Sequence, residues 1–334
     1  MTTTISPPVP LEETIRTETN HLLERRTEWS ILTGTRDLEL TAHALRVLLQ
    51  LDRVAAEAAE FQALADVQRP DGGWNSGLDG APSGPWVSAF AALTCARAVR
   101  VVGDARLSRA VGRAVVFFLI NQNADGSWAD PPSWTRLDAT SHPLSFLHVV
   151  QRDSYPWTTV IDASRSAALA FILAGQDRDG AFRDPGFRAP TEVVASGSPV
   201  EMTAHILEDS LAGALTVSSA PPTVREAARR AARWLVAAQH PDGSWDGGNV
   251  DHTMDATRAL MLAQRVLPEI AAQDAVEAAM AWIVEVKNPQ GWGNFPGEAT
   301  NLERACDGLD TLLKYRVYRL EEVTPIARLW GYAA

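Results

Sequence analysis

The sequence predicts an all-α protein in which six helix pairs close into a ring, an (α/α)6 barrel or toroid. A short Gln-to-Trp motif recurs with its aromatic residues 54, 54, 63 and 47 positions apart, a spacing typical of repeat architectures. An alanine-rich segment precedes each copy, with apolar residues three and four positions apart as in an amphipathic helix. A second helical segment follows each copy, so every repeat supplies two helices.

The motif reads Gln-x-x-Asp-Gly-x-Trp in its complete form. Copies begin at Gln68, Gln122, Gln176 (which ends in Phe182) and Gln239, and a degraded copy runs from Asn288 to Trp292. The Asp-Gly pair is expected to end the preceding helix, because glycine adopts the left-handed conformation of a helix C-terminus without strain. We expect the aromatic ring to wedge between outer helices and the glutamine to bond a helix end. The motif is therefore interpreted as a contact between repeats.

The helices follow from this periodicity. Predicted outer helices cover residues 54–67, 105–121, 158–175, 224–238 and 273–287, and predicted inner helices cover residues 39–51, 86–101, 138–151, 200–217, 251–266 and 298–315. Either residues 11–29 or residues 320–330 supply the sixth outer helix. The predicted organisation is an N-terminal helical extension (1–34), the toroid (35–318) and a C-terminal helical tail (319–334).

Composition excludes several classes of protein. The chain has 334 residues, 46% of them hydrophobic, and a net charge of -11. This acidic balance disfavours nucleic acid and anionic lipid surfaces as partners. Two cysteines exclude a disulfide framework. No basic and apolar leader is visible, and the apolar stretches are too short to span a bilayer. We expect a cytoplasmic protein without stable membrane insertion.

A second pattern recurs at the start of the predicted inner helices. It consists of an acid, a threonine two positions later and a histidine two positions after the threonine. The copies are Glu39 to His43, Asp138 to His142 and Glu201 to His205, with the variants Asp251 to Asp255 and Glu298 to Leu302, and with Trp86 and Phe90 in the second repeat. Residues four apart share one helical face, and the opposite apolar faces must pack on the outer helices. The polar faces should therefore line the central cavity, although helix capping also accounts for the acid and the threonine.

The Gln-to-Trp motifs resemble the QW repeats of the terpenoid cyclase and protein prenyltransferase toroid family. Within that family, Asn249-Val-Asp-His-Thr253 is most similar to the Asp-x-Asp-Asp-Thr signature of class II terpene cyclases. The central aspartic acid of that signature protonates an alkene or an epoxide, so the resemblance implies that Asp251 is a proton donor. Protein prenyltransferases place a zinc-binding cysteine where this chain has Thr253, so their thiolate zinc site cannot form here.

These observations favour a compact enzyme similar to class II terpene cyclases, an isomerase or lyase. Its reaction would be the protonation-initiated cyclisation or isomerisation of a small isoprenoid or isoprenoid-containing molecule. The predicted catalytic residues are Asp251, His252, Asp255, His205 and His142. The predicted substrate-binding residues are Trp86, Phe90, Asp138, Glu201, Arg258 and Phe295.

Three alternatives stay open. The same barrel could house a metal- or histidine-dependent lyase or hydrolase, a prenyl-diphosphate transferase, or a non-catalytic scaffold. No cofactor and no metal ligand are assigned. A divalent metal stays possible, because His142, His205 and Asp255 could present two imidazoles and a carboxylate to it.

Overall fold

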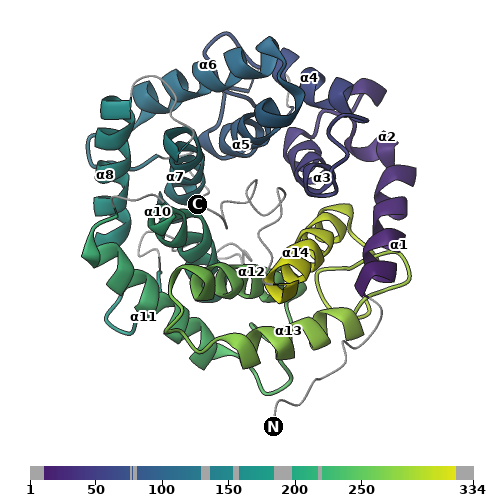
Figure 1. The fold of residues 1–334 in the computed structure, drawn as a ribbon, viewed down its shortest axis with the longest axis vertical. Helices are drawn as coiled ribbons and strands as arrows, with labels where there is room; N and C mark the ends of the chain where they lie inside the picture. Colours follow the sequence, from purple (N-terminus) through teal and green to yellow (C-terminus); the bar gives the residue numbers. More distant parts are fainter. Residues whose placement is uncertain are drawn as a thin grey trace.

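Two concentric rings of helices make up the protein (Figure 1). The computed structural model describes residues 11–75, 77, 81–128, 136–152, 158–183, 198–216 and 220–320. In these ranges the inner ring consists of α3 (Leu38–Gln50), α5 (Pro85–Val102), α7 (Arg136–Arg152), α9 (Pro199–His205) with η2 (Ile206–Ala212) and α10 (Gly213–Leu215), α12 (Val250–Val266) and α14 (Leu302–Leu320). The outer ring consists of α1 (Leu11–Glu24), α4 (Ala58–Asp66), α6 (Ala105–Asn121), α8 (Thr158–Ala174), α11 (Pro222–Ala238) and α13 (Gln273–Glu285).

The all-α toroid predicted from the sequence is confirmed. Among the described residues, extended pairing is limited to two isolated bridges, Gln176 with Phe182 and Asn288 with Gly291. Helix α14 packs against α3 as well as α12, which closes the inner ring. The short elements α2 (Arg26–Trp29) and η1 (Ile31–Thr33) connect the first outer helix to the first inner helix.

The sixth outer helix comes from the N-terminal end of the chain. Helix α1 packs against α14, and Figure 1 places it in the outer ring between α13 and α2. It lies in the stretch predicted as an extension, whereas residues 1–10 and 321–334 are outside the described residues. The boundaries 1–34, 35–318 and 319–334 stay predictions.

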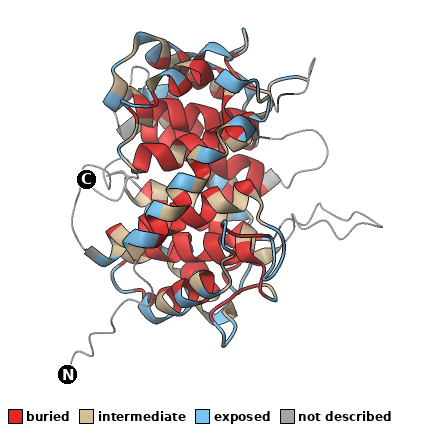
Figure 2. Ribbon diagram, turned by 90° about the vertical axis from the view of Figure 1, so that its right-hand side faces the viewer, coloured by how far each residue is buried: buried red, intermediate tan, exposed pale blue. Residues whose placement is uncertain are grey.

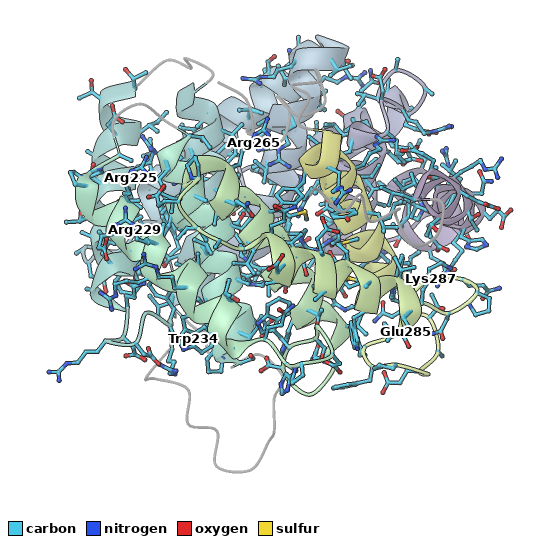
Figure 3. The ribbon with its side chains drawn as sticks, turned by 60° about the horizontal axis from the view of Figure 1, so that its bottom comes forward. Arg225, Arg229, Trp234, Arg265, Glu285 and Lys287 are labelled. Carbon is cyan, nitrogen blue, oxygen red and sulfur yellow. The ribbon has the colours of Figure 1, made fainter. Side chains whose placement is uncertain are left out.

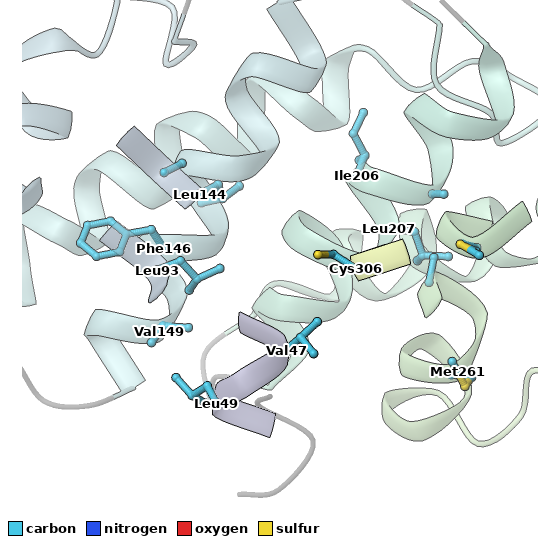
Figure 4. Close-up of a cluster of buried hydrophobic side chains, with 14 of the residues drawn as sticks. Val47, Leu49, Leu93, Leu144, Phe146, Val149, Ile206, Leu207, Met261 and Cys306 are labelled. Carbon is cyan, nitrogen blue, oxygen red and sulfur yellow. The ribbon is translucent and has the colours of Figure 1, made fainter. Parts of the chain in front are cut away.

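The core lies between the two rings. The inner helices are buried along most of their length, whereas the exposed positions concentrate on the outer helices and loops (Figure 2). Figure 4 shows part of the core, in which Leu93 of α5 lies near Phe146 and Val149 of α7. Of the described helices, α5 alone is long and apolar enough to cross a membrane, and 67% of that stretch is buried within the protein.

Each Gln-to-Trp motif links an outer helix to the next one. In the copy before α12, Gln239 Nε2 donates to the carbonyl of Gly243 at 2.9 Å and to that of Ala275 on α13 at 2.8 Å. The Trp245 indole donates to the Leu235 carbonyl of α11 at 2.9 Å. Equivalent glutamine bonds recur at Gln68, Gln122 and Gln176. The contacts agree with a structural role for the motif.

The motif glycine allows the closest approach between these helices. Gly243 has φ +94°, and a Cβ built there would lie 2.5 Å from the Ala278 carbonyl oxygen. Gly72, Gly126 and Gly180 meet the next outer helix in the same way. Only a residue that lacks Cβ and tolerates positive φ fits this position. This packing requirement explains why the Asp-Gly pair recurs.

Candidate functional site

The N-terminal ends of the inner helices meet around a cavity of about 190 Å³. Its wall is mostly ionisable, with an aromatic and apolar part from α5. The lining residues are Glu39, His43, Arg46, Trp86, Ala89, Phe90, Leu93, His142, Ser145, Glu201, His205, Glu208, Asp209, Asp251, Asp255, Arg258, Glu303, Arg304 and Asp307. The polar faces of the inner helices therefore do converge on the centre of the ring.

The threonine of the recurring inner-helix pattern has a structural role. Thr253 Oγ1 accepts the backbone N–H of Trp245 at 3.1 Å, and Thr140 and Thr203 accept those of Trp128 and Phe182. This bond fixes each motif loop to the start of the following inner helix. The residue two positions after each threonine, which is His142, His205 or Asp255, lines the cavity.

Asp251 lies at the start of α12 with its carboxylate beside the Arg304 guanidinium. Burial, together with the Asp255 carboxylate, raises the pKa of Asp251 to about 7, although Arg304 opposes this shift. Its neighbour Asp255 has a lowered pKa: His205 and Arg258 outweigh the effect of burial on that carboxyl. One turn of α12 therefore presents a carboxyl group that titrates near neutral pH and another that is ionised.

His205 bridges two inner helices. Its Nδ1 lies 2.9 Å from Asp138 Oδ1 of α7, and its Nε2 lies 3.2 Å from Asp255 Oδ2 of α12. Burial disfavours the imidazolium, yet the carboxylates of Asp255 and Asp138 hold the pKa of His205 well above its ordinary value. With both ring nitrogens engaged, His205 orients the two carboxylates.

His142 extends this chain of alternating acids and imidazoles. Its Nδ1 lies 2.8 Å from Asp209 Oδ2 of η2, and its Nε2 lies 3.6 Å from Asp138 Oδ1. Burial lowers the pKa of His142, but Asp138 and Asp209 raise it to about 9. The π-helical turn η2 carries Glu208 and Asp209, neighbouring residues that both line the cavity. Such turns interrupt α-helices most often at functional sites.

Trp86 and Phe90 form the aromatic part of the wall. The Trp86 ring centroid lies 4.2 Å from that of His142 and 5.6 Å from that of Phe90. The Trp86 indole donates to Glu39 Oε1 at 2.7 Å. This bond fixes the ring in the cavity wall. Both residues are where the sequence predicted them to be.

Helix α14 contributes site residues that the sequence analysis missed. The predicted opening Glu298 to Leu302 is wrong, because α14 begins at Leu302. The acid and its partner four residues later are instead Glu303 and Asp307. Asp307 Oδ1 lies 3.2 Å from His43 Nδ1, and His43 outweighs the effect of burial to lower the pKa of Asp307. The signal was present as Glu303-x-Ala-x-Asp307, with alanine in place of threonine.

Three further predicted residues, Asp138, His252 and Phe295, do not line the cavity. His252 does not line the cavity, because its Nδ1 lies 2.7 Å from Asp246 and its Nε2 lies 3.4 Å from Glu201. These acids outweigh burial and raise the pKa of His252 to about 10. Phe295 is 43% exposed in the loop before α14 and does not line the cavity either. Its backbone N–H and carbonyl are held in a turn with Glu298, which leaves the ring at the surface.

Arg258 is engaged within the protein. It pairs with Asp255, and its Nη1 donates to Thr311 Oγ1 at 3.0 Å and to the Asp307 carbonyl at 3.2 Å. Burial lowers the pKa of Arg258, but Asp255 and the acids of α14 raise it above the ordinary value. Among the described residues, three clusters have ligand atoms close enough to share a metal ion: Asp138, His142 and His205; Glu39, His43 and Glu303; and Glu201, Asp251 and His252.

Comparisons with known proteins support the fold. No family model matches the chain. A copalyl diphosphate synthase from Streptomyces cyslabdanicus is 31% identical over 127 residues, which are 33% of this chain and 21% of that protein. The chain thus matches only about a fifth of the length of this curated relative.

Solved structures share the toroid. An ent-copalyl diphosphate synthase from Streptomyces platensis is similar with a TM-score of 0.54 at 19% identity, over 82% of this chain and half of that one. A polysaccharide lyase is similar with a TM-score of 0.66 at 13% identity, over 94% of this chain and 99% of that one. Other similar toroids are glycosyl hydrolases. At 12–19% identity, these likenesses show the shared toroid fold.

Proposed function

We propose that the protein is an enzyme that begins its reaction by protonating a carbon–carbon double bond of a small isoprenoid-type substrate. Asp251 is the proposed acid. The observation that carries the proposal is the position of this buried carboxyl on the cavity wall, one helical turn from Asp255. Burial and the Asp255 charge raise the pKa of Asp251 to about 7. A general acid works best when its pKa is near the operating pH. The short match to a copalyl diphosphate synthase adds support.

The surrounding groups suit the charges that such a reaction creates. Arg304 lies against Asp251 and would stabilise the carboxylate left after proton transfer. Trp86 and Phe90 present aromatic rings to the same cavity, and the faces of such rings attract a positive charge. His205 would hold Asp255 in place as an ionised carboxylate. Because most of the residues that line the cavity are ionisable, the substrate would carry a polar group of its own.

Solvent deuterium provides a direct test. The protein is incubated with farnesyl and geranylgeranyl diphosphate in D2O, and the products are analysed by mass spectrometry. Protonation at carbon predicts one deuteron on a carbon of each cyclised or isomerised product. Because the acid must be protonated, kcat/KM should fall as the pH rises through about 7.

A matched pair of variants separates chemistry from helix capping. Asp251→Asn should abolish turnover while leaving the melting temperature nearly unchanged, because asparagine keeps the shape of the side chain. Asp37→Asn is the control: Asp37 caps α3 by accepting the Leu40 N–H at 2.9 Å, and it is exposed outside the cavity. This control should keep full activity. Activity retained in Asp251→Asn, or products without deuterium, would overturn the proposal.

A second candidate is a carbohydrate lyase or hydrolase. The observation that favours it is the polar wall, in which Asp251 would be a protonated acid and ionised Asp255 a possible base. Release of unsaturated or reducing sugars from acidic polysaccharides, measured by absorbance and lost in Asp251→Asn, would support this reaction over the isoprenoid one.

A further inference from the structure

We propose that Asp138, His142 and His205 form a binding site for one divalent transition-metal cation such as Zn2+ or Co2+. The site lies beside the proposed acid and goes beyond the proposed function, because cation binding does not depend on which substrate enters the cavity. Asp138 and His142 share one face of α7, one helical turn apart, and His205 ends α9 on the adjacent inner helix.

The spacing of the three ligand atoms suits a metal ion. Asp138 Oδ1 lies 2.9 Å from His205 Nδ1 and 3.6 Å from His142 Nε2. Ligands at about 2.0–2.1 Å around a tetrahedral ion are about 3.3 Å apart, midway between these two distances. Two imidazole nitrogens and one carboxylate favour zinc, cobalt or iron over magnesium or calcium, which prefer oxygen ligands.

One atom of the cluster lacks a partner. His142 Nε2 is buried without a hydrogen bond, in a residue that is only 6% exposed, and it faces Asp138. A buried polar atom without a hydrogen bond is costly, so it calls for an explanation such as a bound ion. A cation between His142 Nε2, Asp138 and His205 would supply the missing contact.

In addition, a carboxylate contacts the second ring nitrogen of each imidazole, the one that would not bind the ion. His142 Nδ1 lies 2.8 Å from Asp209 Oδ2, and His205 Nε2 lies 3.2 Å from Asp255 Oδ2. A metal-binding histidine characteristically donates its other N–H to a carboxylate, which fixes the tautomer and the ring orientation. Asp255 therefore acts as a positioning residue behind His205, whereas the sequence analysis placed it among the possible metal ligands.

The other two clusters, by contrast, contain no buried side-chain atom without a hydrogen bond. His43 Nδ1 is engaged by Asp307 at 3.2 Å. Both nitrogens of His252 are engaged by acids, and Asp251 pairs with Arg304. Because His142 and His205 both line the cavity, a cation at the Asp138 cluster would have its open coordination position toward the substrate. There it would bind a substrate oxygen as a Lewis acid.

Cobalt titration tests the site without any activity measurement. The purified full-length protein is dialysed against a chelator, transferred to chelator-free buffer and titrated with Co2+, followed by visible absorption and calorimetry. We expect one Co2+ per chain with the intense absorption of four- or five-coordinate cobalt. X-ray absorption should detect two imidazole ligands. Failure of the wild-type protein to bind, or a weak octahedral spectrum with oxygen ligands alone, would overturn the proposal.

Variants then assign the ligands. His142→Ala and His205→Ala should lose saturable binding, and Asp255→Asn should weaken it roughly 10- to 100-fold. His43→Ala is the matched control, because His43 occupies the equivalent position on α3 in the same cavity; it should bind Co2+ as the wild type does. Binding lost in His43→Ala but kept in His142→Ala would place the ion elsewhere and refute the assignment. If a variant fails to fold, the number of imidazole ligands that X-ray absorption detects in the wild-type protein tests the proposal instead.

Discussion

Truncation of Trp245 tests the structural interpretation of the repeat motif most directly. The side chain is fully buried, and its indole donates to the Leu235 carbonyl at 2.9 Å. Replacing a buried tryptophan by alanine costs about 3–5 kcal/mol through lost packing and the cavity left behind. Leu235 is in the last turn of α11, so its carbonyl has no partner within the helix, and losing the indole adds about 1 kcal/mol. Trp245→Ala should therefore reduce the free energy of unfolding by about 4–6 kcal/mol.

The expected change in melting temperature follows from chain length. An unfolding entropy of about 2.1 cal/mol/K per residue gives about 0.7 kcal/mol/K for 334 residues. A loss of 4–6 kcal/mol then lowers the melting temperature by about 6–9 °C, which differential scanning calorimetry resolves easily.

Trp234→Ala is the matched control, because it removes the same side chain from the adjacent position of α11. Trp234 is partly exposed and packs against the Arg183 guanidinium at 5.6 Å; Figure 3 labels it on the same outer helix as Arg225 and Arg229. Trp234 also packs partly against the core, so its loss costs about 1–2 kcal/mol, or about 1–3 °C. Equal shifts in the two variants would refute the view that the motif tryptophan links the repeats.

Three further predictions concern stability and can be checked by thermal or chemical denaturation. Gly243→Ala should cost about 2–5 kcal/mol, since it combines positive φ with a Cβ 2.5 Å from a carbonyl, whereas Gly103→Ala, with φ +65° in open space, should cost about 1–2 kcal/mol. The raised pKa of His252, about 10, means that the folded state keeps a proton that the unfolded state releases above about pH 6.5. His252 should thus make stability fall as the pH rises from 6.5 toward 10, by up to roughly 1.4 kcal/mol per pH unit, in addition to the contributions of His142 and His205. His252→Gln should reduce the slope by this amount; an unchanged slope would contradict the assignment. Lys314→Met removes the closest cation from buried Asp310 and partly buried Glu208, which keep only longer contacts to Arg258 and Arg46, and should cost about 2–4 kcal/mol. Arg316→Met breaks only a pair with the exposed Glu12 and should cost under about 1 kcal/mol; similar costs would show that burial does not control these pairs.

The ring architecture could be predicted because its signals are local and repeated. The Asp-Gly pair ends a helix and the apolar periodicity gives its buried face, so the helix ranges come close to those observed. The first aromatic link was missed: Trp29 donates to the Leu22 carbonyl at 2.9 Å without a Gln-to-Trp motif before it. A single copy that lacks the glutamine and glycine carries no periodic signal of its own.

The sequence predicted several residues that line the cavity, but not which side chains pair with one another. Positions four apart on the inner helices correctly placed His142, His205 and Asp255 near the cavity. The pattern misplaced the sixth helix start, because Glu298 and Thr300, in the loop before α14, repeat the spacing of the acid and threonine in the other copies. It also said nothing about which acid each histidine meets. Those contacts join residues from different repeats, and chain spacing does not fix them.

The sequence by itself determined that this chain folds into a helical ring with acidic and histidine-bearing inner helix ends. Helix periodicity and glycine conformations act within a few residues, so they can be read along the chain. Only the tertiary structure decided that Asp138 lies between His142 and His205, and that Asp251 keeps a high pKa beside Arg304. The reason is that burial and charge depend on groups brought together from distant repeats, and closing the ring is what brings them together.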